Sequence, residues 1–146
     1  MDKVLFSSRK DDWETPRELF DALNQEFQFT LDVASSHNNA LCRKHYTKEE
    51  NGLAQSWAGE TVWCNPPYGR EAQAWIAKAS EEAGNGVTTV MLLPARTDTI
   101  AFHRYIYHKA EVRFLKGRLH FRMGGEGPAD RAPFPSMIVI FRPKKD

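Results

Sequence analysis

The run Asn65-Pro66-Pro67-Tyr68 carries the clearest chemistry in this 146-residue chain. Consecutive prolines hold φ at both positions and remove two backbone N–H donors, so the backbone is stiff and the Pro66 carbonyl is left to accept from a ligand. Asn65 adds a second acceptor, its side-chain carbonyl, and Tyr68 adds a flat aromatic face. Two acceptors beside a stacking surface suit a planar NH2 group on a conjugated ring or carbonyl. Accepting both amine hydrogens draws the nitrogen lone pair out of conjugation and makes the nitrogen a better nucleophile, with no proton-abstracting base required.

The elements on either side place this run at the edge of a sheet. A short apolar strand, Thr61–Cys64, comes directly before it, and a helix over residues 70–83 follows, with Trp75, Ile76 and Ala79 on one face. Ligands of open α/β sheets bind beyond the carboxyl ends of the strands, which is where the run falls. The alternative is a rigid loop with a surface tyrosine, and the strand-to-helix setting favours the binding interpretation.

The rest of the chain alternates strands with helices. An amphipathic helix is predicted over residues 16–27, with Thr15 as its cap, Pro16 at its first position and Glu18 closing a capping box. Short strands are predicted over residues 29–34, 87–93, 111–115 and 136–141, with a further helix near Asp98 and a loop over residues 123–135. This order predicts an α/β fold whose sheet is mostly parallel and has helices on both faces.

The composition fits one domain over residues 1–146, with residues 1–12 as a flexible arm and no second domain. Hydrophobic residues make up 41% and charged residues 27%, which excludes fibrous and disordered proteins. The net charge of +1 hides a division, because residues 1–102 carry 10 basic and 15 acidic side chains, whereas residues 103–146 carry 10 and 4. An anionic partner is therefore expected to meet the C-terminal third.

Other site types find little support. Cys42 and Cys64 are 22 residues apart, which matches neither a redox pair nor a zinc motif, and the five histidines lack the spacing of a metal site. Ser136 lacks the G-x-S-x-G context of a nucleophile. No apolar run approaches the ~18 residues needed to span a bilayer, and the N-terminus lacks the apolar region of a signal peptide. We expect a cytoplasmic protein with no metal and no membrane partner.

An ordered set of motifs resembles the small phage-type DNA N6-adenine methyltransferases and covers about residues 11–142. The motifs are Asp12-Trp13-Glu14-Thr15-Pro16, Phe29–Ala34, Asn51-Gly52-Leu53 with Trp57, Val62–Tyr68, Leu93–Asp98, Gly117–Phe121 and Pro135-Ser136. The resemblance implies a Rossmann-like methyltransferase fold that transfers a methyl group from S-adenosylmethionine to N6 of adenine in DNA. The catalytic residues would be Asn65, Pro66, Pro67 and Tyr68. Asn65 and the Pro66 carbonyl would hold the amine, and Tyr68 would stack on a base flipped out of the duplex.

The candidate cofactor-binding residues are Trp13, Thr15, Pro16, Asp32 and Glu50. The first three resemble a motif that packs near the methionine part of the cofactor, and Asp32 resembles the acid that binds its amino group. Glu49 and Glu50 are candidates for the ribose because they precede Asn51-Gly52. The chain departs from larger methyltransferases after Asp32, where Val-Ala-Ser-Ser-His replaces a glycine-rich turn and limits how closely the backbone can approach the cofactor.

The candidate DNA-binding residues are Arg96, Arg118, Arg122 and Arg131. Basic and apolar side chains interleave over residues 113–122. This pattern suits a strand with one face packed on the protein and the other face on DNA phosphates. Arg96 has two interpretations, a phosphate contact or an ion pair with Asp98. Any reading of bases would fall to loops such as residues 35–56 and 123–135, so the target sequence is expected to be short or weakly specified.

Two other functions remain open at this point. A base in RNA or a glutamine side chain of a protein also presents a planar NH2 group to the same acceptors. The absent glycine turn also suits a degenerate methyltransferase fold that binds DNA without catalysis.

Overall fold

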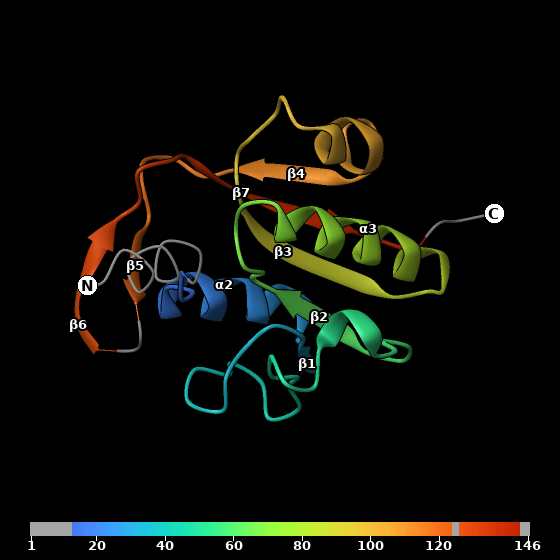
Figure 1. Cartoon of the computed structure of the whole chain (residues 1–146), viewed down its shortest axis with the longest axis horizontal. Helices are drawn as coiled ribbons and strands as arrows, with labels where there is room; N and C mark the ends of the chain where they lie inside the picture. Colours follow the sequence, from blue (N-terminus) through green and yellow to red (C-terminus); the bar gives the residue numbers. More distant parts are fainter. Residues whose placement is uncertain (1–12, 124–125, 144–146) are drawn as a thin grey trace.

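A computed structural model of the chain describes residues 13–123 and 126–143 (Figure 1), with the backbone alone for residues 122, 123 and 126–130. The predicted arm, residues 1–12, lies outside the described residues. The elements are α2 (Arg17–Phe27), β1 (Leu31–Asp32), η1 (Gly52–Ala54), β2 (Thr61–Cys64), α3 (Glu71–Gly84), β3 (Thr88–Pro94), η2 (Phe102–Ile106), β4 (Glu111–Phe114), β5 (His120–Met123), β6 (Glu126–Arg131) and β7 (Ser136–Phe141). The segment η1 is a 3-10 helix and η2 is a π-helix.

Five strands form one sheet in the order β1-β2-β3-β7-β4. The strands β1, β2 and β3 are parallel, whereas β7 is antiparallel to both of its neighbours, β3 and β4. β4 therefore runs in the same direction as β1 to β3, and the predicted parallel arrangement holds for these four strands, while β7 makes the sheet mixed. The parallel strands bring their last residues, Asp32, Cys64 and Pro94, to one edge, which we call the carboxyl edge.

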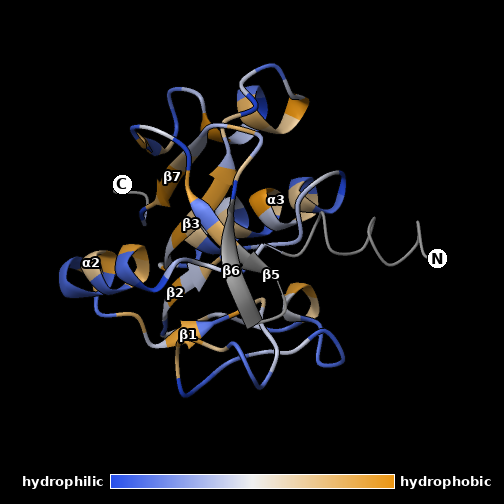
Figure 2. Cartoon of the chain, turned by 90° about the vertical axis from the view of Figure 1, so that its left-hand side faces the viewer, coloured by the Kyte–Doolittle hydropathy of each residue, from blue (hydrophilic) through white to orange (hydrophobic). Residues whose placement is uncertain are grey.

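Helices cover both faces of the sheet. Leu93 of β3 packs in a core cluster with Trp75 of α3, and its neighbour Leu92 packs in a second cluster with Phe20 of α2. Figure 2 shows α2 and α3 on opposite sides of the strands. Because side chains alternate across a strand and both faces are buried, the strands read as continuous apolar runs rather than as alternating patterns.

The helix α2 begins one residue later than predicted and without the predicted cap. Pro16 occupies the N-cap position and no side chain caps the helix, so the expected capping role of Thr15 is wrong. The Thr15 hydroxyl instead accepts a hydrogen bond from Asn65, which lies 50 residues further along the chain. No helix in the described part of the chain is long and apolar enough to cross a membrane.

The strands β5 and β6 form a separate two-stranded antiparallel ribbon, and β6 lies within residues 123–135, where a loop was predicted. The segment of β6, Glu126–Arg131, contains Gly127, Pro128 and Asp130, residue types that disfavour strands, so pairing with β5 rather than local preference makes it extended. Phe121 of β5 is fully buried and belongs to the core cluster on the α2 side, which anchors the ribbon to the rest of the fold.

Candidate active site

Asn65 leaves the end of β2 with its amide held in one orientation. Its Nδ2 atom donates to the Trp13 carbonyl at 2.5 Å and to the Thr15 hydroxyl at 3.0 Å. Both amide hydrogens are therefore used inside the protein. The Oδ1 atom is buried and has no hydrogen-bond partner. No residue that the structure describes donates to the Pro66 carbonyl either, so two acceptors remain next to each other in sequence at the carboxyl edge.

Unpartnered polar atoms gather at this edge. The buried side-chain atoms without a hydrogen-bond partner, among the described residues, belong to Ser35, Asn65, Thr89 and Ser136. Ser35 lies three residues beyond β1, and Ser136 opens β7 opposite Pro94, the last residue of β3. Buried polar atoms are normally hydrogen-bonded, and leaving one unsatisfied costs about 1–3 kcal/mol. Three such atoms beyond neighbouring strand ends indicate that a polar ligand belongs there.

Tyr68 is buried, with 3% of its surface exposed, and its hydroxyl donates to the Leu92 carbonyl at 3.3 Å. Burial raises the pKa of this hydroxyl well above its ordinary value, so the group is no proton acceptor at neutral pH. The ring meets Phe121 edge-on at 6.3 Å and Phe134 at 5.6 Å, and both of these rings also contact Trp13. We call Trp13, Tyr68, Phe121 and Phe134 the aromatic cluster. The predicted stacking face of Tyr68 thus lies against other rings.

The carboxylates of the two candidate acids, Asp32 and Glu50, accept hydrogen bonds from nearby residues of the chain. The Asp32 carboxylate accepts from the backbone N–H groups of Ala34 at 3.3 Å and Leu41 at 3.0 Å. Burial raises the pKa of Asp32 above its ordinary value, against the opposite effect of these two hydrogen bonds. Glu50 accepts from the backbone N–H and the hydroxyl of Thr47, and these bonds lower the pKa of its carboxyl. Both carboxylates therefore shape the segment that follows β1.

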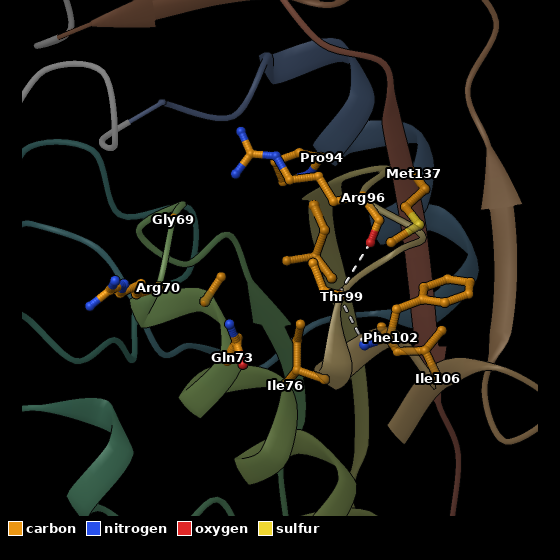
Figure 3. Close-up of a pocket in the computed structure, with 12 residues that line it drawn as sticks. Gly69, Arg70, Gln73, Ile76, Pro94, Arg96, Thr99, Phe102, Ile106 and Met137 are labelled. Atoms are coloured by element: carbon orange, nitrogen blue, oxygen red, sulfur yellow. Dashed lines mark hydrogen bonds between the residues drawn. The ribbon is translucent and has the colours of Figure 1, made fainter. Parts of the chain in front are cut away.

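Arg96 stands beside a cavity of about 290 Å³ at the carboxyl edge. Its guanidinium carbon lies 5.9 Å from the centre of the Phe134 ring, and no ion pair joins it to Asp98 in the described structure. Arg70 also lines the cavity and is likewise without an ion pair among the described residues. Figure 3 shows Arg70, the N-cap residue of α3, and Ile76 of α3 on one side of the cavity, and Phe102 of η2 on the other. Sequence reasoning missed Arg70, although it follows the Asn65–Tyr68 run by two residues.

The other candidate arginines lie on or beside the β5–β6 ribbon. Arg131 and Arg118 are exposed, and the side chain of Arg122 lies outside the described structure. No described contact joins these residues to Asn65. Arg113 also belongs to the basic C-terminal third of the chain, but it forms an ion pair inside the protein. Its guanidinium binds both carboxylate oxygens of Glu26 at 2.7 Å.

Metal-binding geometry is missing from the described residues, where no three His, Cys, Asp or Glu side chains are placed to hold an ion. His37 and His45 do approach each other, with 2.9 Å between Nδ1 and Nε2, but they form a hydrogen bond with each other.

The sequence matches a known protein family over nearly its whole length. The family model described as DNA N-6-adenine-methyltransferase (Dam) matches residues 3–146. The chain belongs to the Dam family. The Dam relative from Escherichia phage T1, named a DNA N-6-adenine-methyltransferase, is 33% identical over 155 residues, which cover 94% of this chain and 65% of the relative. The chain thus spans slightly less than two thirds of that relative's length.

A second relative matches a shorter part of this Dam-family chain. It is YfdM of Escherichia coli K12, provisionally named a methyltransferase, which is 37% identical over 65 residues. The match covers 40% of this chain and 71% of the relative.

We predict that Asp32 makes folding stability depend on pH in a defined direction. The folded-state pKa lies above the ordinary value of 3.8, so the folded protein binds this proton more tightly than the unfolded chain. The contribution of Asp32 is present in full below the unfolded-state pKa and is lost as the pH rises through the folded-state pKa. Urea denaturation should show wild type gaining stability relative to Asp32→Asn as the pH falls from 7 to 4, and a flat or opposite difference would contradict this prediction.

Proposed function

We propose that this chain is a DNA adenine-N6 methyltransferase that uses S-adenosylmethionine and has a Rossmann-like arrangement of its parallel strands. The single observation that carries the proposal is the Asn65 amide, whose hydrogens bond Trp13 and Thr15 while Oδ1 is buried without a partner. An acceptor in this state, with the Pro66 carbonyl beside it, suits a primary amine on a flat ring. Membership of the Dam family supports adenine as that ring.

Asn65 and the Pro66 carbonyl act by binding both hydrogens of adenine N6. The lone pair then points away from the ring system and attacks a methyl carbon in line with its leaving group. The cofactor, when bound, supplies that methyl group on a positively charged sulfur, which leaves as a neutral thioether. The methylated amine loses one proton to solvent, so no residue of the chain has to act as a strong base.

The cofactor fits the part of the carboxyl edge that follows β1. Ser35 brings a buried hydroxyl without a partner to this place, and Asp32 holds the loop around it through Ala34 and Leu41. We propose that Ser35 binds the charged amino-acid end of the cofactor and that Asp32 acts through the loop. Trp13 and Thr15 bind Asn65, and with Pro16 they are proposed to border the same group. Glu50 instead supports the turn before η1, through its bonds to Thr47.

The target base must reach the Asn65 Oδ1 atom, which is buried, and the Pro66 carbonyl. We propose that a flipped adenine separates Phe134 from Tyr68 and stacks on the Tyr68 ring. Phe134 is only partly buried and stands between the exposed prolines Pro133 and Pro135, so its ring lies at the outer side of the cluster. Arg70, Arg96, Arg118, Arg122 and Arg131 are proposed to contact the phosphates.

The first prediction for this function concerns Asn65→Ala. Incubation with methyl-labelled S-adenosylmethionine should label DNA adenine, and the variant should lose on the order of a hundredfold or more of the rate, because it removes a group that binds the reacting amine. Asn38→Ala, at an exposed asparagine without a described hydrogen bond, is the matched control and should keep its rate. If the label appeared in RNA or in a protein glutamine instead, that molecule and not DNA would be the substrate. If no label appeared and no cofactor bound, the non-catalytic alternative would be favoured.

The second prediction concerns the cofactor. Ser35→Ala should weaken S-adenosylmethionine binding by about three- to tenfold in calorimetry, since it removes one hydrogen bond to a charged group. Ser80→Ala, on α3 and away from the carboxyl edge, serves as the control. Equal affinities of wild type and Ser35→Ala would place the cofactor elsewhere.

The third prediction concerns the arginines at the cavity. Arg70→Gln and Arg96→Gln should each lower DNA affinity and reduce the magnitude of the slope of log K against log salt by about 1. Each variant would neutralise one phosphate fewer than wild type, so its binding would release one counterion fewer from the DNA. Arg142→Gln should leave the slope nearly unchanged, since Arg142 pairs with Glu111 at 3.0 Å. Unchanged slopes for both cavity variants would show that DNA does not pass this rim.

A further inference from the structure

An asparagine amide can present either end to a ligand, because a rotation of 180° about its last bond exchanges oxygen and nitrogen. Only the orientation with oxygen toward the substrate can accept from an amine. In this structure the nitrogen end of Asn65 faces the Trp13 carbonyl and the Thr15 hydroxyl, at 2.5 and 3.0 Å. The opposite orientation would set two oxygen atoms against each other at Trp13 and present NH2 to NH2 at the substrate.

We propose that Thr15 and the Trp13 carbonyl are positioning groups that hold the Asn65 oxygen toward the substrate amine. The inference rests on the proposed function and deepens it. It assigns to Trp13 and Thr15 a role in binding the substrate amine, in addition to any contact with the cofactor. Thr15 acts through Asn65 and does not touch the reacting atoms. Its hydroxyl oxygen accepts from Nδ2, and the Trp13 carbonyl, which has no hydrogen to give, accepts from the same nitrogen.

Residues 13–16 are held in place by the packing of their neighbours. Pro16 follows Thr15 as the N-cap of α2, and Phe20 and Leu23 of that helix are buried against the sheet. The Trp13 ring packs edge-on against Phe121 at 5.3 Å. Core packing on both sides therefore fixes the two acceptors. If the Asn65 amide turned, the Trp13 carbonyl could not move away to relieve the contact between the two oxygen atoms.

The same contacts require asparagine rather than aspartate at this position. Asn65→Asp places a carboxylate oxygen against the Trp13 carbonyl, and two oxygens at this distance repel each other. A protonated carboxyl restores one donor toward Trp13 and leaves one acceptor for the substrate. We therefore expect the kcat of Asn65→Asp to rise as the pH is lowered, with no such rise in wild type.

The central test compares three threonine variants in methyl transfer to DNA. Thr15→Val keeps the shape of the side chain and removes the acceptor, so kcat should fall by about three- to tenfold, the effect of one hydrogen bond. The DNA KM should stay close to wild type, and the cofactor Kd should change less than kcat. Thr15→Ser keeps the hydroxyl and should recover most of the rate. Thr88→Val, at the start of β3 and far from the carboxyl edge, should have no effect.

A readout independent of activity accompanies these rates. The side-chain amide resonances of Asn65 in ¹⁵N NMR should shift in Thr15→Val and return toward wild type in Thr15→Ser. A loss of cofactor affinity with unchanged kcat would overturn the positioning role in favour of a cofactor contact. An Asn65→Asp variant with full activity at pH 8 would also overturn it.

The two proposals fail in different ways. Wild-type protein that transfers no methyl group to DNA refutes the proposed function itself. Wild-type protein that is active, alongside a Thr15→Val variant with the same kcat and the same Asn65 resonances, refutes only the positioning role.

Discussion

Two hydrogen bonds from one asparagine connect the end of β2 to the segment before α2, and the arrangement of the site depends on them. They cross about 50 residues of sequence and join two parts of the chain that pack through different contacts. The packing of Phe20 on the sheet sets where α2 lies, and α2 sets where the Trp13 carbonyl and the Thr15 hydroxyl lie. The orientation of a single amide is in this way a consequence of how the apolar face of a helix is buried.

The carboxyl edge combines tight packing with unsatisfied polar atoms. Ser35, Asn65 and Ser136 each bring a buried atom without a partner to the ends of neighbouring strands. A folded chain tolerates such atoms at a cost of about 1–3 kcal/mol each, and a bound ligand can remove that cost. Arg113 shows the opposite behaviour, because its guanidinium binds both Glu26 and Glu111. The contrast separates side chains that support the fold from those that are left for a ligand.

Local patterns in the sequence predicted the parts of the fold that local interactions determine. The strand before Asn65 and the last strand, Ser136–Phe141, agree with the structure because each is an apolar run bounded by turn residues. The place of the Asn65–Tyr68 run at the strand ends follows from the same pattern. Membership of the Dam family agrees with the resemblance found in the ordered motifs.

Contacts between distant residues were beyond such patterns. The β5–β6 ribbon exists through cross-strand pairing, which its Gly- and Pro-containing sequence does not signal. Thr15 had the residue type and the position of a helix cap, and only the three-dimensional packing shows that its hydroxyl serves Asn65 instead. Asp32 and Glu50 were candidate ligands by residue type, and the folded loops use their carboxylates first.

The central claim is that the oxygen of the Asn65 amide receives the amine of the target base. Its most direct test is a high-resolution structure of the protein with S-adenosylhomocysteine and a DNA that contains the target adenine. We predict adenine N6 within hydrogen-bond distance of Asn65 Oδ1 and of the Pro66 carbonyl, with Nδ2 still bonded to Trp13 and Thr15. An Asn65 amide turned with Nδ2 toward the base, or a target base bound away from these two acceptors, would contradict the claim.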